Sequence, residues 1–340
     1  MHGPRRILSC VPQQLTDKDE KLDWLDTAMA RHRPHIVVTP QEFFGGAVQM
    51  LHNRDHRFED LFPTLQKLVL KHKCALAVGV QQRMDDKTNR EAIWFINEKG
   101  KFQGSLFKFA LPKYDHVATN GFGDVVPETD MMNRFKLFKM QGMLVSGVFC
   151  WEVYSDLLWT GLGLLKPDVV FSMIKFGPNA WPKVRKRKGK ATVVDFGYGT
   201  WAEGGGWIER LHVASKWQVK CPIVNSTNSW GLRPISMPIC GTICEIPGQA
   251  DHTLWHPTKE DKLKSVPEKI VVDEIDPARV QYALQNKFTY KDAVGDFPPF
   301  DLGRFTMMLK INRIEDRMLS GREAAVTDKA VAKRRGGFGL

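Results

Sequence analysis

Residues 143–154 read MLVSGVFCWEVY, and this stretch decides the fold. The run from Met143 to Phe149 has the length and apolar character of a buried strand. The strand ends at Cys150, which is followed by Trp151 and Glu152. A buried strand that leads directly into reactive side chains is typical of layered enzymes, because the sheet fixes the position of those side chains and the following loop leaves them accessible.

Similar short apolar runs recur along the chain, separated by helical or turn-rich sequence, which predicts a layered protein of strands and helices. The expected strands are Arg6 to Val11, Ile36 to Thr39, Cys74 to Val80, Ala92 to Ile96, Met143 to Phe149, Asp168 to Ser172, Pro222 to Asn225 and Ile270 to Ile275. Helical spacing of apolar residues predicts helices over Asp17 to Arg31, Phe58 to Lys73 and Glu209 to Lys220, and a further helix after Cys150.

The composition excludes several classes of protein. The longest apolar stretches fall far short of the roughly 20 residues that a membrane-spanning helix needs. The apolar run from Ile7 to Val11 is closed by Pro12 and is too short for a signal peptide, so we expect a cytosolic protein. The 49 Lys and Arg against 38 Asp and Glu give a formal charge of +11, which favours anionic partners without identifying one.

No cofactor or metal is expected. The six cysteines include no C-x-x-C pair, and the histidines show no metal-ligand spacing. The glycines at 204–206 lack the Lys-Ser/Thr of a phosphate-binding loop.

Three reactive side chains stand where expected strands end. Glu42 follows the strand in IVVTPQEFFGG, Lys108 lies in SLFKFALPKYD, and Cys150 ends the strand quoted above. Each residue alone has an ordinary explanation, as a turn carboxylate, an amphipathic lysine or a packed thiol. Their order at three separate strand ends indicates a shared site.

The motifs around these residues resemble those of the nitrilase, or carbon-nitrogen hydrolase, superfamily, and the resemblance extends from about Arg6 to Ile275. The matching elements are Pro40-Gln41-Glu42, Phe107 to Leu111, Cys150-Trp151-Glu152, Val224 to Gly231, and Ile246-Pro247-Gly248. The sequence departs from the family in Gln41, which separates Pro40 from Glu42 and leaves the register of the base open. Val153 stands where true nitrilases have Asn, which weakens the case for a nitrile substrate.

The resemblance implies an α+β fold, a four-layer α-β-β-α sandwich. Residues 1–280 would form the hydrolase domain, with a basic insertion at about 181–207 that we read as a surface loop. Residues 281–340 would form an extended C-terminal arm that is partly disordered or contacts the partner subunit of a homodimer or larger homo-oligomer.

The resemblance also implies covalent catalysis on a C–N bond. Glu42 would act as general base, Cys150 as nucleophile and Lys108 as the stabiliser of the oxyanion, with the backbone N–H of Trp151 as a second donor. These residue types suit the chemistry, because a thiol becomes a good nucleophile when a carboxylate takes its proton and a cation favours the thiolate.

Several further residues enter through the same resemblance. Glu128 is the expected second active-site glutamate, with Asp124 and Glu152 as weaker substitutes, and Lys113 is the fallback for Lys108. The candidate substrate-binding residues are Trp151, Glu152, Asn179 and Trp181. The Lys183 to Lys190 run is either a solvated loop or a lid that attracts an anionic small-molecule substrate.

The expected function is hydrolysis of an amide or N-carbamoyl compound, rather than a nitrile, through a cysteine thioester. Two alternatives stay open: an acyltransferase that uses the same three residues, and a basic binding protein on a degenerate hydrolase scaffold. Membrane and nucleic-acid partners are not expected.

Overall fold

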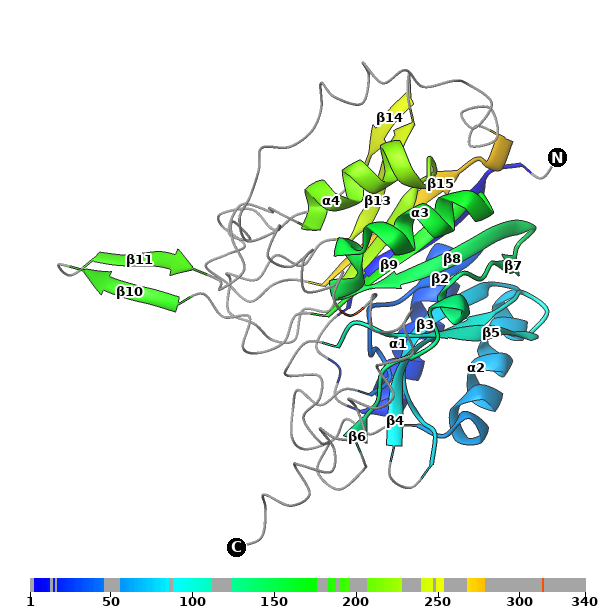
Figure 1. Cartoon of the computed structure of the whole chain (residues 1–340). Helices are drawn as coiled ribbons and strands as arrows, with labels where there is room; N and C mark the ends of the chain where they lie inside the picture. The colour runs from blue at the N-terminus through cyan, green and yellow to red at the C-terminus, as the bar shows by residue number, and fades with distance from the viewer. Residues whose placement is uncertain are drawn as a thin grey trace, which may run out of the picture.

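The computed structural model describes residues 3–12, 15, 17–45, 56–85, 88–111, 124–175, 183–187, 190–195, 207–227, 240–246, 249–253, 268–278 and 314. Within these ranges two β-sheets lie face to face, and helices cover the outer side of each sheet (Figure 1). The predicted α+β class and α-β-β-α order are confirmed.

The first sheet contains the N-terminal strands. Its order is β15 (Lys269–Ile275), β1 (Arg5–Val11), β2 (Ile36–Val38), β3 (Ala75–Arg83), β4 (Thr88–Ile96) and β5 (Phe102–Phe107), and β6 (Asp124–Val125) pairs with β4. The strands β1, β2 and β3 run parallel, so their carboxyl ends lie at one edge of the sheet.

The second sheet contains the strand that leads to Cys150. Its order is β14 (Gln249–His252), β13 (Gly241–Ile246), β12 (Ile223–Thr227), β9 (Val169–Ile174), β8 (Met143–Phe149) and β7 (Phe138–Met140). The central strands β12, β9 and β8 are parallel. Each sheet therefore has a parallel centre whose strand ends are suited to carry functional side chains.

The helices cover the outer faces through their apolar sides. Helices α1 (Lys18–His32) and α2 (Phe58–His72) pack on the first sheet, and α3 (Asp156–Leu165) and α4 (Trp207–Val213) pack on the second. A capping box between Asp17 and Glu20 starts α1, because the two side chains satisfy backbone N–H groups that the first helical turn leaves free.

The layer between the sheets is apolar and is crossed by a few polar links. Side chains such as Ile93 and Phe171 meet there and are fully buried. Ser226 joins the two sheets, because its Oγ accepts the N–H of Cys10 at 2.9 Å and donates to the carbonyl of Val38 at 2.8 Å. The facing strand ends are therefore held at a fixed separation.

All eight expected strands are present, but several others were not predicted. The strand β5 reads FQGSLF and contains Gly104, β13 reads GTICEI, and β7 and β14 are short edge strands whose apolar pattern is weak. The helix expected over Glu209 to Lys220 is α4 followed by a π-helical turn at Ala214–Gln218. None of the described helices is long and apolar enough to cross a membrane.

The basic run forms a hairpin within the segment that we read as a surface loop. Strands β10 (Lys183–Arg187) and β11 (Lys190–Asp195) pair antiparallel and extend away from the sandwich (Figure 1). The two residues between them in the sequence, Lys188 and Gly189, fit the length and glycine content of a tight hairpin connection, a signal that the cluster of charges concealed.

The remaining structural expectations fall largely outside the described residues. Of the C-terminal arm, Ile314 is described, and it packs against the core layer that contains α3 and α4.

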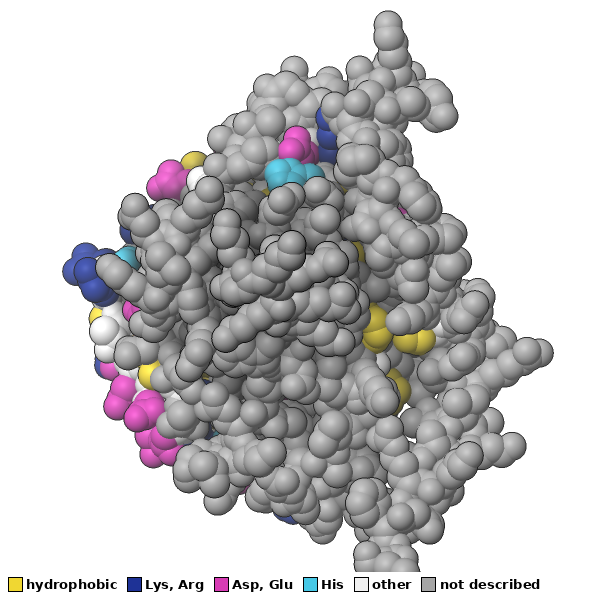
Figure 2. All heavy atoms as spheres, turned by 90° about the vertical axis from the view of Figure 1, so that its left-hand side faces the viewer, with side chains coloured by type: hydrophobic (Ala, Val, Ile, Leu, Met, Phe, Trp, Pro, Cys, Tyr) yellow, Lys and Arg dark blue, Asp and Glu magenta, His cyan; other side chains and the backbone are white. Residues whose placement is uncertain are grey.

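Described acidic and basic side chains lie interspersed along one edge of the face shown in Figure 2.

Candidate active site

Glu42 lies on a tight turn at the end of β2. The backbone at Glu42 has a φ of 51°, in the left-handed region that non-glycine residues rarely adopt. The turn packs closely on Gly79 of β3, where an added Cβ would lie 2.2 Å from the carbonyl oxygen of Pro40 and 2.7 Å from the Glu42 nitrogen. Conformations of this kind persist where the surrounding structure fixes them, often at functional sites.

Lys108 follows β5, and hydrogen bonds of both its backbone N–H and its backbone carbonyl fix its position. Its N–H donates to the carbonyl of Glu91 at 3.0 Å, and its own carbonyl accepts the N–H of Glu128 at 2.9 Å. The side chain is 1% exposed, so its ammonium group needs compensation inside the protein. The Nζ atom lies 3.0 Å from Oε2 of Glu91, which is equally buried.

Cys150 is the first residue after β8 and begins the short helical turn Cys150–Tyr154. Its side chain is half-buried, and the thiol donates to the carbonyl oxygen of Lys175 with an Sγ–O distance of 3.4 Å. All six cysteines lie in the described part of the chain, and the other five are buried. Cys150 is therefore the thiol with the best access for a substrate.

The Glu152 carboxylate fixes the backbone on both sides of the site. It accepts the N–H of Phe149 at 3.1 Å, immediately before Cys150, and the N–H of Phe109 at 2.8 Å, immediately after Lys108. Arg134 completes this arrangement with an N–O distance of 2.6 Å, and both charged side chains are fully buried. Glu152 thus links the segment that carries the lysine to the segment that carries the thiol.

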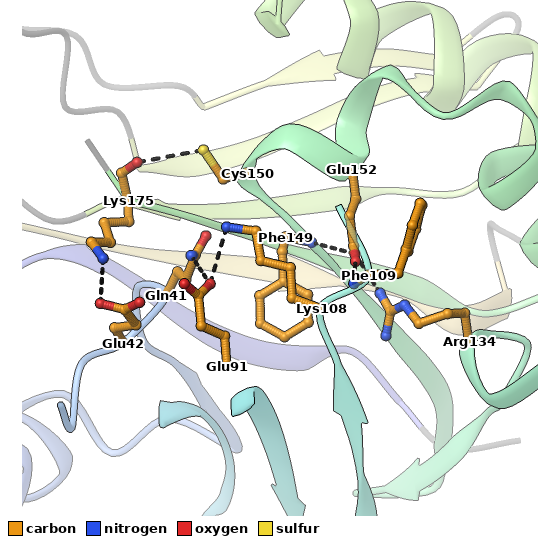
Figure 3. Close-up of polar contacts among 10 residues, drawn as sticks. All are labelled: Gln41, Glu42, Glu91, Lys108, Phe109, Arg134, Phe149, Cys150, Glu152 and Lys175. Atoms are coloured by element: carbon orange, nitrogen blue, oxygen red, sulfur yellow. Dashed lines mark hydrogen bonds and ion pairs between the residues drawn. The ribbon is translucent and has the colours of Figure 1, made fainter. Parts of the chain in front are cut away.

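Lys175 was not singled out from the sequence. It follows β9, and its Nζ lies 2.5 Å from Oε2 of Glu42, while its backbone carbonyl accepts the thiol of Cys150. The predicted base and the predicted nucleophile, 108 residues apart in the chain, therefore contact the same residue. Figure 3 shows these side chains, with Lys108 and Glu91, reaching into one region from both sheets.

Glu91 is the second residue that the sequence analysis missed. It lies on β4, is 1% exposed, and contacts the ammonium of Lys108 and the side-chain amide of Gln41. Burial raises the pKa of Glu91 to about 7; the ammonium of Lys108 opposes this shift, and the charge of Glu42 reinforces it. A buried carboxyl group that titrates near neutral pH is typical of functional sites.

Both missed residues carried a signal in the sequence. Lys175 directly follows the apolar run VVFSMI. A reactive side chain at the end of an apolar run is also the signal that identified Glu42 and Cys150. Glu91 directly precedes the apolar run AIWFI, but its position at the start of that run does not show whether its charge is buried. Neither could be assigned to the site, because the pairing of Lys175 with Glu42 spans 133 residues and that of Glu91 with Gln41 spans 50.

The structure places the other predicted residues at different distances from this cluster. The carboxylate of Glu128 is buried, and it accepts the N–H groups of Thr129 and Asp130 at 2.9 and 3.0 Å and lies 3.5 Å from Arg90. Trp151 is partly buried and packs against the core beside α3. The backbone of Asp124 forms β6, where it pairs with Thr88 at the start of β4.

Three predicted residues cannot be placed. Asn179, Trp181 and Lys113 lie outside the described residues. Substrate binding by Trp151 and Glu152 stays a prediction, although the Glu152 carboxylate already contacts Arg134 and two backbone N–H groups. Among the described residues no group of three or more His, Cys, Asp or Glu side chains is arranged to hold a metal ion.

Comparison with solved structures finds the same architecture in several carbon-nitrogen hydrolases. A carbon-nitrogen hydrolase from Helicobacter pylori G27 matches with a TM-score of 0.61 at 11% identity, over 86% of this chain and 99% of that one. XC1258 from Xanthomonas campestris, a CN-hydrolase superfamily protein with an arsenic adduct in its active site, matches with a TM-score of 0.60 at 12% identity, over 89% of this chain and 100% of that one.

An amidase from Nesterenkonia sp. AN1 also matches, with a TM-score of 0.54 at 14% identity, over 84% of this chain and 94% of that one. In that mutant structure the acetamide moiety of fluoroacetamide is covalently attached to the active-site cysteine. No family model matches the sequence, and no curated protein matches it. On the structural matches, the described part of this chain has the fold of the nitrilase, or carbon-nitrogen hydrolase, superfamily.

Proposed function

We propose that this protein is a thiol-dependent hydrolase of non-peptide C–N bonds, a member of the superfamily whose fold it has. One observation carries the proposal: Lys175 contacts both Glu42 and Cys150, while Glu91 contacts Lys108 and Gln41, the neighbour of Glu42. These contacts gather a carboxylate, an ammonium group and an accessible thiol where strands of two facing sheets end. That combination supplies a base, an electrostatic stabiliser and a nucleophile.

In the proposed reaction Glu42 takes the proton from the thiol of Cys150, and the sulfur attacks the carbonyl carbon of the substrate. The resulting oxyanion is stabilised by the ammonium of Lys108 and by the backbone N–H of Trp151. The C–N bond breaks as the amine or ammonia leaves with the proton from Glu42. Water, deprotonated by Glu42, then hydrolyses the thioester and releases the acid and the free thiol.

We propose an amide or N-carbamoyl compound as the substrate. The Nesterenkonia amidase, which shares this fold, takes up an amide-derived group at its cysteine, which supports a small amide as the first probe. The proposal of Glu128 as a further active-site glutamate rests on the hydrogen bond between its N–H and the Lys108 carbonyl. Through this bond Glu128 would fix the backbone that positions the lysine.

The test is covalent labelling with fluoroacetamide followed by peptide mapping. The expected result is a single adduct on Cys150 in the wild-type protein and none in Cys150→Ala. Cys221→Ala is the matched control, because Cys221 is a fully buried thiol and its removal should leave the Cys150 adduct unchanged. A wild-type protein that neither shows an adduct on Cys150 nor releases ammonia from fluoroacetamide would contradict the proposal and leave a basic binding protein as the alternative.

Product analysis then separates hydrolysis from acyl transfer. Ammonia release is measured over a panel of amides, ureas and nitriles, with and without added hydroxylamine. Hydrolysis predicts release of the free acid without added amine, whether or not hydroxylamine traps part of the thioester. An acyltransferase would give little product until the amine is added, because water would not resolve its thioester.

A further inference from the structure

Glu91 occupies the centre of a buried cluster of charges beneath Cys150. Glu42 and Gln41 reach it from the turn after β2, Lys108 from the end of β5, and Lys175 acts on it from the end of β9. Figure 3 shows Glu91 between the two lysines, below the thiol. Within the described structure the cluster thus holds two carboxyl groups and two ammonium groups.

Glu91 and Glu42 are two buried carboxyl groups of one cluster, and a hydrogen bond between them would require a proton, because two ionised carboxylates are acceptors only. One of the two glutamates is therefore neutral while this bond exists. Glu42 has the closer cation, at 2.5 Å from Lys175, against 3.0 Å between Glu91 and Lys108. The stronger pairing favours the negative charge on Glu42 and the proton on Glu91.

We propose that Glu91 is a positioning residue of the thiol site, a neutral carboxylic acid that donates a hydrogen bond to the Glu42 carboxylate and accepts one from the Lys108 ammonium. This role rests on the proposed function, since it serves the base and the lysine of that reaction. The proton on Glu91 stays there through the cycle, while the thiol proton moves to Glu42 and leaves with the amine. Glu91 contacts the Lys108 side chain, whereas Glu128 contacts the Lys108 backbone.

The charge balance explains why a neutral Glu91 is useful. With Glu91 protonated, the cluster has two ammonium groups and one carboxylate, which leaves one positive charge beneath Cys150. That sign stabilises both a thiolate and a tetrahedral oxyanion. With Glu91 ionised the cluster is neutral, and the additional negative charge raises the proton affinity of the neighbouring thiol.

The pKa of Glu91 at about 7 sets where this change occurs. The second-order rate constant for alkylation of Cys150 by iodoacetamide is measured from pH 5 to 9, with the modified residue identified by mass spectrometry. For the wild type we expect the plot of this rate constant against pH to have an inflection near pH 7. Above it the rate constant should rise less steeply with pH than the titration of one isolated thiol predicts. Glu91→Gln should remove the inflection and keep the rate at pH 6 within about 3-fold of wild type, because the amide also donates one hydrogen bond and accepts another.

Two further variants sharpen the test. Glu91→Ala removes both hydrogen bonds and should lower the alkylation rate at least about 10-fold at pH 6. Glu59→Gln is the matched control, since Glu59 is exposed on α2, and should reproduce the wild-type profile. Glu91→Ala with the wild-type rate would show that Glu91 does not position the site.

The remaining outcomes separate this inference from the proposed function. A wild-type profile without an inflection between pH 6 and 8 overturns the role of Glu91, and this result does not depend on a variant that folds. A Glu91→Gln profile that keeps the inflection also overturns it. If fluoroacetamide labels Cys150 in the same preparation, the proposed function survives that failure. If fluoroacetamide leaves Cys150 unlabelled and releases no ammonia, the proposed function has failed, whatever the alkylation profile.

Discussion

The Nζ atom of Lys175 lies 2.5 Å from Oε2 of Glu42, and both side chains are almost completely buried. The pair joins the end of β9 in one sheet to the turn after β2 in the other. Because both side chains are buried and each charge compensates the other, removing one leaves the other in an unfavourable environment. This contact therefore holds Glu42 in place and connects the two halves of the site.

Removing the ammonium group of Lys175 should be costly. For Lys175→Met we expect a loss of about 3–5 kcal/mol in the free energy of unfolding, since Glu42 is left buried without its partner. Urea unfolding measures this loss. The control is Lys71→Met, which breaks an exposed pair with Asp26 and should change the stability by less than about 1 kcal/mol. Equal effects of the two substitutions would argue against a buried, compensating pair at Glu42.

The close contact between Gly79 and the Glu42 turn predicts a strong effect of one methyl group. In Gly79→Ala the added Cβ would overlap the carbonyl of Pro40, so the turn must shift away from β3. We expect a loss of about 1–3 kcal/mol in stability. The displaced base should also slow adduct formation with fluoroacetamide. Gly3→Ala, with no atom within 4 Å of the new methyl, should leave both quantities unchanged.

The buried pair of Arg134 and Glu152 predicts a non-additive result. Glu152→Ala alone should cost about 3–5 kcal/mol, because the Arg134 guanidinium loses its counter-ion and two backbone N–H groups lose their acceptor. Arg134→Met alone should also destabilise the protein strongly. The double substitution should cost less than the two single losses added together. A double-mutant cycle from urea unfolding gives the coupling, and a coupling near zero would contradict the contact.

The reactivity of the thiols should follow their burial. Burial raises the pKa of the thiols of Cys10 and Cys221 well above the usual value and that of Cys74 and Cys240 to about 12, so these groups stay protonated. We expect iodoacetamide at pH 8 to modify Cys150 first in the native protein. Peptide mapping at short reaction times checks this. Modification of the five buried cysteines at the same rate would show that the thiols open to solvent together.

The raised pKa of Glu91 also predicts the direction of a pH effect on stability. Between the ordinary value of 4.5 and about 7, the folded protein holds a proton that the unfolded chain has lost, so stability falls as the pH rises through this window. The difference between the two pKa values corresponds to a loss of about 3 kcal/mol in the free energy of unfolding across this pH range. Thermal or urea unfolding of Glu91→Gln should show a correspondingly smaller decline between pH 4.5 and 7. Parallel curves for the two proteins would rule out a buried, titrating Glu91.

Part of this site was determined by the sequence alone. The apolar run from Met143 to Phe149 can form a buried strand whatever surrounds it, and the chain must turn near Cys150 because the run ends there. The same local rule placed Glu42 at the end of its strand. Eight strands and the positions of the helices followed from such patterns, since periodicity depends only on neighbouring residues.

The partners of these residues were decided only by the tertiary structure. Lys175 meets Glu42 and Cys150, and Glu91 meets Lys108, because two sheets pack face to face with their strand ends at a common edge. No local pattern encodes a contact across 133 residues, because the energy of that contact exists only after both sheets have formed. The sequence therefore determined where along the chain reactive groups occur, and the packing of the sheets determined which of these groups form ion pairs and hydrogen bonds with one another.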